Sequence, residues 1–156
     1  MAEATLSGAT HPILENDYAS EWMGIEVLAL SDGHATIRMP LRQEMLNGFG
    51  MAHGGMIFAF GDTAFALACN PIQPAPGEEG TITVASGVDI NFLKPAFRGQ
   101  VLTAVADRRS SAGRSGLYDI QIFAADAAAP ATETQPSSPG ELIAEFRGRS
   151  RTIPKK

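Results

Sequence analysis

One long apolar segment constrains the fold of this chain more than any other feature. The run from Met56 to Cys69 carries a single formal charge, at Asp62, and directly follows two glycines. This composition predicts an α-helix that is apolar on nearly every side. Such a helix has to be covered over most of its surface. In a chain of 156 residues, a curved sheet wrapped around the helix provides that cover.

The rest of the sequence supplies strands for this sheet. Two apolar-rich runs, 25–30 and 34–39, are joined by Ser31-Asp32-Gly33, which is typical of a hairpin turn. Later segments alternate apolar and polar residues with a period of two, as antiparallel strands with one covered face do. These segments lie near 88–92, 102–107, 118–122 and 142–149. The predicted fold class is α+β, with an antiparallel sheet of about six strands around one long central helix.

The pattern fits a single domain over residues 11–153, with flexible ends at 1–10 and 154–156. The stretch 127–140 is rich in Ala, Pro, Ser and Thr and has no periodicity, which predicts a mobile insertion. A turn is expected over residues 110–116, between two of the later strands.

A short helix is also expected before the first strand, over residues 11–23. Leu14, Tyr18 and Trp22 recur there at helical spacing, and Gly24 follows as a helix terminator.

The composition excludes several classes of function. A net charge of −5 argues against nucleic acid as a partner, and no uncharged apolar run is long enough to span a membrane. The N-terminus lacks a signal-peptide pattern, so we expect a cytoplasmic protein. Cys69 is the single cysteine and is expected to be a buried, inert thiol. His11, His34 and His53 are too scattered to predict a metal site.

Asp62 and the glycines before the helix are the candidate chemical groups. An ionised carboxylate in an apolar helix is costly to bury unless it has partners or a function. The backbone amides of Gly54 and Gly55 lie at the predicted helix N-terminus, where partial positive charge collects. A carboxylate together with amides that attract anions indicates chemistry on a carbonyl group.

The spacing of these groups predicts a shared site. Gly54 and Asp62 are eight residues apart, which is about 12 Å along one helix. One carbonyl carbon cannot contact both groups at that distance. We therefore expect a homodimer in which two antiparallel helices bring Gly54 of one chain near Asp62 of the other, with two sites per dimer.

Several motifs, in order and with compatible spacing, resemble the hotdog-fold acyl-CoA thioesterases, and best the PaaI type of phenylacetate degradation. The matching segments are 45–48, 53–55, 62–66, 91–95 and 146–150. The resemblance covers about residues 11 to 153. The departures are the insertion at 127–140 and a longer loop near 71–81.

The resemblance implies an activity and roles for residues. It implies hydrolysis of acyl-CoA thioesters, with aryl or hydroxylated arylacetyl groups as the expected acyl part. The Gly54 amide would bind the thioester carbonyl oxygen, Asp62 would supply the carboxylate, and Asn47 would position substrate or water. His53 lies next to the oxyanion amide. A structural role remains open for both, His53 as a helix cap and Asn47 as a turn former.

The resemblance also implies how the substrate is held. Coenzyme A enters as part of the substrate, so no cofactor is expected, and the dimers are expected to pair into tetramers. Gly55, together with basic residues at turns, is expected to contact the CoA part. These basic residues are Lys94, Arg98 and Arg114.

Three alternatives stay open at the level of sequence. Asp62 can act as a nucleophile or as a general base toward water, and we favour the base. A hydratase or dehydratase on the same fold is a second possibility, and it needs a histidine close to a carboxylate. A non-catalytic module that binds acyl-CoA is a third.

Overall fold

The computed structural model describes residues 10–127 and 139–156. Two short helical segments come first, η2 (Pro12–Leu14) and α1 (Tyr18–Met23). They precede β1 (Glu26–Ser31), β2 (His34–Pro40), the short η3 (Gln43–Met45) and α2 (Gly54–Cys69). The remaining elements are β3 (Thr81–Phe92), β4 (Gln100–Ala112), β5 (Ser115–Asp126) and β6 (Glu141–Pro154).

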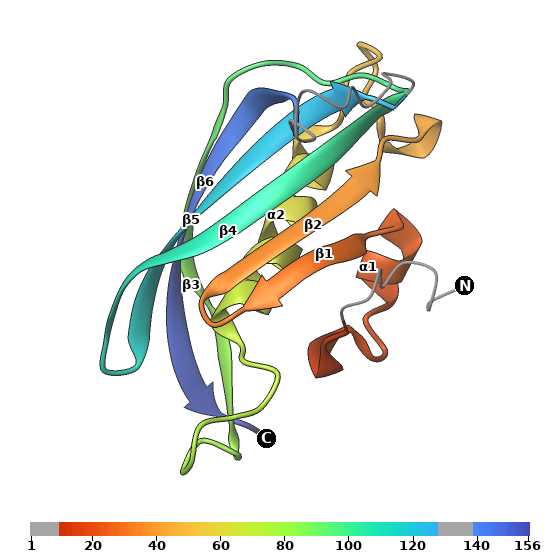
Figure 1. Cartoon of the computed structure of the whole chain (residues 1–156). Helices are drawn as coiled ribbons and strands as arrows, with labels where there is room; N and C mark the ends of the chain where they lie inside the picture. The colour runs from red at the N-terminus through yellow and green to blue at the C-terminus, as the bar shows by residue number, and fades with distance from the viewer. Residues whose placement is uncertain (1–9, 128–138) are drawn as a thin grey trace, which may run out of the picture.

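The six strands form one sheet in the order β1-β2-β4-β5-β6-β3, and every neighbouring pair is antiparallel. The sheet is strongly twisted, and α2 lies along one of its faces (Figure 1). The predicted α+β hotdog architecture is therefore confirmed. β1 and β3 are the two edge strands, so among the described residues the 12-residue β3 pairs with a strand on one side only.

The core lies between α2 and the sheet. The Phe65 ring of α2 packs against Phe146 and Tyr118, with ring centroids 6.0 Å and 5.4 Å away. A Cβ atom at Gly148 of β6 would lie 2.6 Å from the Phe65 ring, so glycine lets the helix approach the sheet there. Leu102, Ala104 and Ala106, which alternate with polar or partly exposed residues along β4, are all fully buried.

The end of α2 is fixed by Asn70. Its side-chain Nδ2 donates to the carbonyls of Ala66 and Thr83, both at 2.9 Å, and its Oδ1 accepts from the Thr83 amide at 3.0 Å. Pro71 follows and cannot continue the helix. The C-terminal end of α2 is thereby tied to β3.

The single helix predicted over residues 11–23 is wrong, because the segment is divided into η2 and α1. Asn16 adopts a left-handed φ of 65°, which breaks the helix, and the Asp17 side chain then caps α1 by accepting from the Ser20 amide. Tyr18 and Trp22 are 71% and 50% exposed, so they do not form a buried stripe. Gly24 ends α1 in the left-handed conformation, as predicted.

Two other boundaries differ from the sequence prediction. The turn expected over 110–116 is shorter, because β4 continues to Ala112 and β5 begins at Ser115. At the C-terminal end expected to be flexible, Pro154 belongs to β6 and the Lys155 amide donates to the Gly80 carbonyl at 2.7 Å. The predicted insertion at 127–140 and the predicted flexible segment 1–10 lie mostly outside the described residues.

Candidate active site

The start of α2 presents one free backbone amide. His53 is the N-cap, and its Nδ1 accepts from the Gly55 amide at 3.0 Å. Its carbonyl accepts from the amides of Met56 and Ile57. Within the described residues, the Gly54 amide has no hydrogen-bond partner. The residue predicted to bind a carbonyl oxygen therefore has its donor available, whereas the Gly55 amide is already engaged.

Gly54 lies beneath an aromatic ring from the edge strand. A Cβ atom at this position would come 3.3 Å from the Cζ atom of Phe92. A larger residue at position 54 would therefore crowd the ring and narrow access to the amide. The sequence alone does not mark Phe92 as part of the site, because a phenylalanine in an alternating strand is more typical of the core.

A closed turn holds the segment before α2. The Oδ1 atom of Asn47 accepts from the amides of Phe49 and Met51 at 2.9 Å and 3.2 Å, and the Gly50 amide donates to the Asn47 carbonyl. Gly50 has a φ of 78°, which this turn requires. Asn47 thus acts as a turn former, and its Nδ2 donor is the part of the side chain left for a substrate. The turn directs the Phe49 ring outward, where it is 85% exposed.

Asp62 lies on the face of α2 that the sheet of its own chain does not cover completely. The carboxylate is half-buried and makes no hydrogen bond or ion pair with any described residue. Burial raises its pKa above the ordinary value of 3.8. A raised pKa makes a carboxylate a stronger base toward water, and perturbed groups of this kind cluster at functional sites.

One chain alone does not bring Gly54 and Asp62 together. Both belong to the same continuous helix, and eight residues correspond to about 12 Å of rise. Gly55, Phe58 and Asp62 follow each other at helical spacing, and all three are at least partly exposed. This open stripe is the part of α2 that a second chain can cover.

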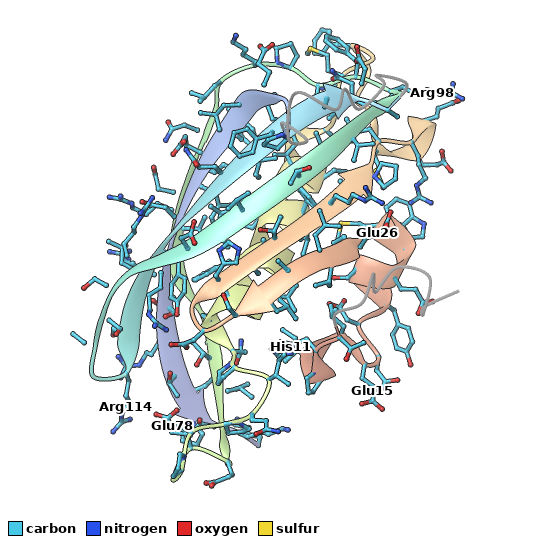
Figure 2. All side chains as sticks on the ribbon, viewed as in Figure 1. His11, Glu15, Glu26, Glu78, Arg98 and Arg114 are labelled. Atoms are coloured by element: carbon cyan, nitrogen blue, oxygen red, sulfur yellow. The ribbon has the colours of Figure 1, made fainter. Side chains whose placement is uncertain are left out.

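The basic residues predicted to contact CoA do not converge in one chain. Lys94 pairs with Glu141 at 2.7 Å, and the Arg98 Nη1 atom donates to Gln43 at 3.1 Å. Arg114 lies in the β4–β5 turn, at the opposite end of the molecule from Arg98 (Figure 2). One nucleotide cannot contact both Arg98 and Arg114 of the same chain.

Two further predictions concern reactive groups. Cys69 is buried, as predicted, and burial raises the pKa of its thiol to about 12, which disfavours the reactive thiolate. The described residues contain no cluster of three or more side chains suited to hold a metal ion. They also contain no helix that is long and apolar enough to cross a membrane.

Comparison with known proteins places this architecture in a class. The family model of the thioesterase superfamily matches residues 49–131, which include the whole of α2 and therefore Asp62. The chain is 36% identical to acyl-coenzyme A thioesterase PaaI of Escherichia coli over 143 residues, covering 92% of this chain and 88% of the relative. The chain therefore belongs to the thioesterase superfamily.

Solved structures agree with this assignment. The PaaI protein from the phenylacetic acid degradation operon of E. coli superposes with a TM-score of 0.73 at 36% identity, covering 92% of this chain and 90% of that one. The TT0310 protein from Thermus thermophilus has a TM-score of 0.70 at 29% identity, with coverage of 87% and 97%. The hotdog fold of a PaaI-type thioesterase is thus shared along most of the chain.

Proposed function

We propose that this protein hydrolyses acyl-CoA thioesters to a free acid and CoA, with phenylacetyl or hydroxylated arylacetyl groups as the preferred acyl part. The main support is the half-buried Asp62 on the same helix as the Gly54 amide, neither of which has a hydrogen-bond partner in the part of the chain that the structure describes. The E. coli relative is an acyl-CoA thioesterase and comes from the phenylacetic acid degradation operon, which makes these acyl groups the first to test. The proposal includes a role in aromatic catabolism in the cytoplasm.

In the proposed reaction, the Gly54 amide donates to the thioester carbonyl oxygen and stabilises the oxyanion as it forms. The partner subunit supplies its own Asp62, which removes a proton from water while the water oxygen bonds to the carbonyl carbon. The carbon–sulfur bond then breaks, and the CoA thiolate leaves and is protonated. No bound cofactor takes part in this scheme.

The scheme needs a homodimer, and two features of the chain support one. The stripe of Gly55, Phe58 and Asp62 on α2 stays partly exposed in the single chain. The edge strand β3 is 12 residues long and exposes apolar side chains such as Ile82 and Val84. A long apolar edge of this kind favours pairing with another chain. The proposed assembly is a dimer with shared sites, which pairs again into a tetramer.

The hydratase alternative is less well supported than hydrolysis. It needs a histidine that exchanges protons beside a carboxylate. The Nδ1 atom of His53 already accepts from the Gly55 amide, so this nitrogen serves as a helix cap. A non-catalytic binding module would have no use for a carboxylate left without a partner in an apolar helix.

The test is a panel of acyl-CoAs assayed in parallel for release of free thiol and for change in enoyl absorbance. We expect thiol release, fastest with arylacetyl groups, and no enoyl signal. Enoyl formation without thiol release would instead identify a hydratase or dehydratase. Tight binding with no turnover of any acyl-CoA would identify a binding module.

The shared site is tested by mixing two inactive variants, Gly54→Val and Asp62→Asn. Each mixed dimer would contain one intact site and one doubly altered site. Random mixing should therefore restore about a quarter of the wild-type activity. If both groups act within one chain, the mixture stays inactive.

A further inference from the structure

Phe92 is the last residue of the edge strand β3, and its ring lies on the helix side of the sheet. Side chains two residues apart along a strand share a face, and Val88 and Ile90 both pack against the core. On the other face, the Nδ2 atom of Asn91 donates to Asp89 at 3.1 Å. Phe92 nevertheless stays 52% exposed in the single chain. Part of an aromatic ring on the covered face is therefore accessible to another molecule.

The tip of this ring lies against the glycine that carries the candidate oxyanion amide. A Cβ atom on Gly54 would lie 3.3 Å from Cζ of Phe92 and 3.7 Å from each Cε atom, so the ring approaches with its far edge. The Cα–Cβ direction in a helix tilts toward the N-terminal end, where the first amide also points. From standard bond lengths, the Cζ atom lies within about 6 Å of the Gly54 nitrogen. A carbonyl oxygen that accepts from this amide, at about 2.9 Å, would lie beside the ring.

Backbone hydrogen bonds fix the ring and the amide to one frame. The amide of Ala52, two residues before the glycine, donates to the Ala96 carbonyl at 2.8 Å and joins the segment before α2 to the loop after β3. The amide of Leu93, directly after the phenylalanine, donates to the Ile143 carbonyl at 2.8 Å and holds this loop to β6. The ring and the amide are therefore positioned relative to each other before a substrate enters, as preorganised sites require.

The ring restricts the space next to the reacting carbonyl carbon. A thioester is planar, and the hydrogens of a CH2 group beside its carbonyl occupy little space. A methyl group in place of one hydrogen projects from the thioester plane and needs as much room as the Cβ atom that Phe92 would crowd at position 54. Binding sites distinguish groups that differ by one carbon by about 10–200-fold. The edge of a phenyl ring, fixed at this point, is sufficient for discrimination of that order.

We propose that Phe92 is a specificity-determining residue, and that its ring excludes acyl groups branched at the carbon next to the thioester carbonyl. This inference rests on the proposed thioesterase function and adds the chemical class of acyl group that the site rejects. Arylacetyl groups carry a CH2 group at this carbon and are therefore admitted. Branches further along the acyl chain do not meet the ring tip and are tolerated.

The experiment compares CoA thioesters that carry phenylacetyl, 2-phenylpropanoyl or 3-phenylpropanoyl groups. The second has a methyl branch beside the carbonyl, and the third is its unbranched isomer. The measured quantity is the ratio of kcat/KM for the unbranched isomer to kcat/KM for the branched one. Phe92→Ala should reduce this ratio at least about tenfold, and Phe92→Leu should reduce it by a smaller factor. The intrinsic reactivity of the two thioesters cancels, because the ratio is compared between enzymes.

Leu93→Ala is the matched control, because Leu93 is the next residue and is 51% exposed, whereas the three atoms nearest a Cβ atom at Gly54 all belong to Phe92. It should leave the ratio unchanged. In all three variants, the ratio between phenylacetyl-CoA and 3-phenylpropanoyl-CoA should stay within about twofold of the wild type. The role of Phe92 is overturned if its alanine variant keeps the wild-type ratio of the two isomers, or if Leu93→Ala reduces that ratio equally. If Phe92→Ala does not fold, Phe92→Leu decides by the same criterion.

Failure of the proposed function gives a different result. If the wild type hydrolyses none of these thioesters, the thioesterase proposal fails, and binding then tests the ring. In ketone analogues, a CH2 group separates the CoA sulfur from the carbonyl carbon, so the analogue binds without being cleaved. Calorimetry with the branched and unbranched ketones gives the corresponding ratio of Kd values, which Phe92→Ala should also reduce. An unchanged Kd ratio, or no binding of either ketone, overturns the role of Phe92.

Discussion

A carboxylate on the open face of α2 and a carboxylate on the outer face of the sheet have opposite electrostatic environments. On the sheet, Asp119 accepts from Arg147 at 2.7 Å and from Arg109 at 2.8 Å, and these hydrogen bonds lower its pKa. On the helix, Asp62 has no partner among the described residues, and burial raises its pKa. Within the described residues, arginines thus pair with one partly buried carboxylate and not with the other. We therefore expect Asp119 to stabilise the fold and Asp62 to serve the proposed reaction.

The largest expected effect tests this difference directly. Asp62→Asn keeps the size of the side chain and removes the base, so kcat for thioester hydrolysis should fall at least about 10²-fold. The melting temperature should stay the same or rise, because an unpaired charge is removed. Asp119→Asn is the matched variant, and it should leave kcat nearly unchanged while lowering the melting temperature. Equal rates for wild type and Asp62→Asn would remove the proposed mechanism.

The next effect concerns access to the free amide. In Gly54→Ala, the new methyl group would lie 3.3 Å from the Phe92 ring and beside the amide. We expect kcat/KM to fall about tenfold or more, which is less than the 10²–10³ lost when an oxyanion donor is removed outright. Gly48→Ala serves as control, because a Cβ atom there meets nothing within 4 Å. A similar loss of kcat/KM in both variants would mean that the turn before α2, and not access to the Gly54 amide, causes the effect.

The sequence predicted the elements that follow from periodicity and the residues that stand out chemically. The apolar run identified α2, period-two alternation identified the later strands, and Asp62 stood out as the single charge in its segment. The prediction of one helix over residues 11–23 failed because Asn16 adopts a left-handed backbone conformation. The spacing of the side chains does not encode that conformation. For a similar reason, the sequence does not show which basic residues are free to contact CoA. Lys94 and its partner Glu141 are far apart in sequence, so only the fold shows that this charge is already paired.

A smaller effect separates the two roles of Asn47. Asn47→Ala removes the acceptor for the amides of Phe49 and Met51, so the free energy of unfolding should fall by about 1–2 kcal/mol. Asn47→Asp keeps that acceptor and removes only the Nδ2 donor. Denaturant unfolding and kcat, measured on both variants, distinguish the roles. Loss of activity with unchanged stability in Asn47→Asp would show that the donor contacts substrate, whereas unchanged activity would leave Asn47 with the turn alone.

The smallest effect is the pH dependence of stability, and its sign differs between the two carboxylates. The pKa of Asp62 is raised above 3.8 in the folded protein, so the unfolded chain releases this proton at lower pH than the folded one. The contribution of Asp62 to the free energy of unfolding therefore falls as pH rises from about 3.8 through the folded pKa, and then stays constant. Asp119 has a lowered pKa, so its contribution to the free energy of unfolding is complete above about pH 3.8 and is lost as pH falls through the folded pKa.

Urea unfolding between about pH 3 and 7 is the measurement. Relative to the wild type, Asp62→Asn should gain stability as pH rises toward neutral, and Asp119→Asn should lose stability as pH rises over a lower range. If Asp62→Asn lost stability toward neutral pH as Asp119→Asn does, Asp62 would have a positively charged partner, and the contrast between the two faces would fail.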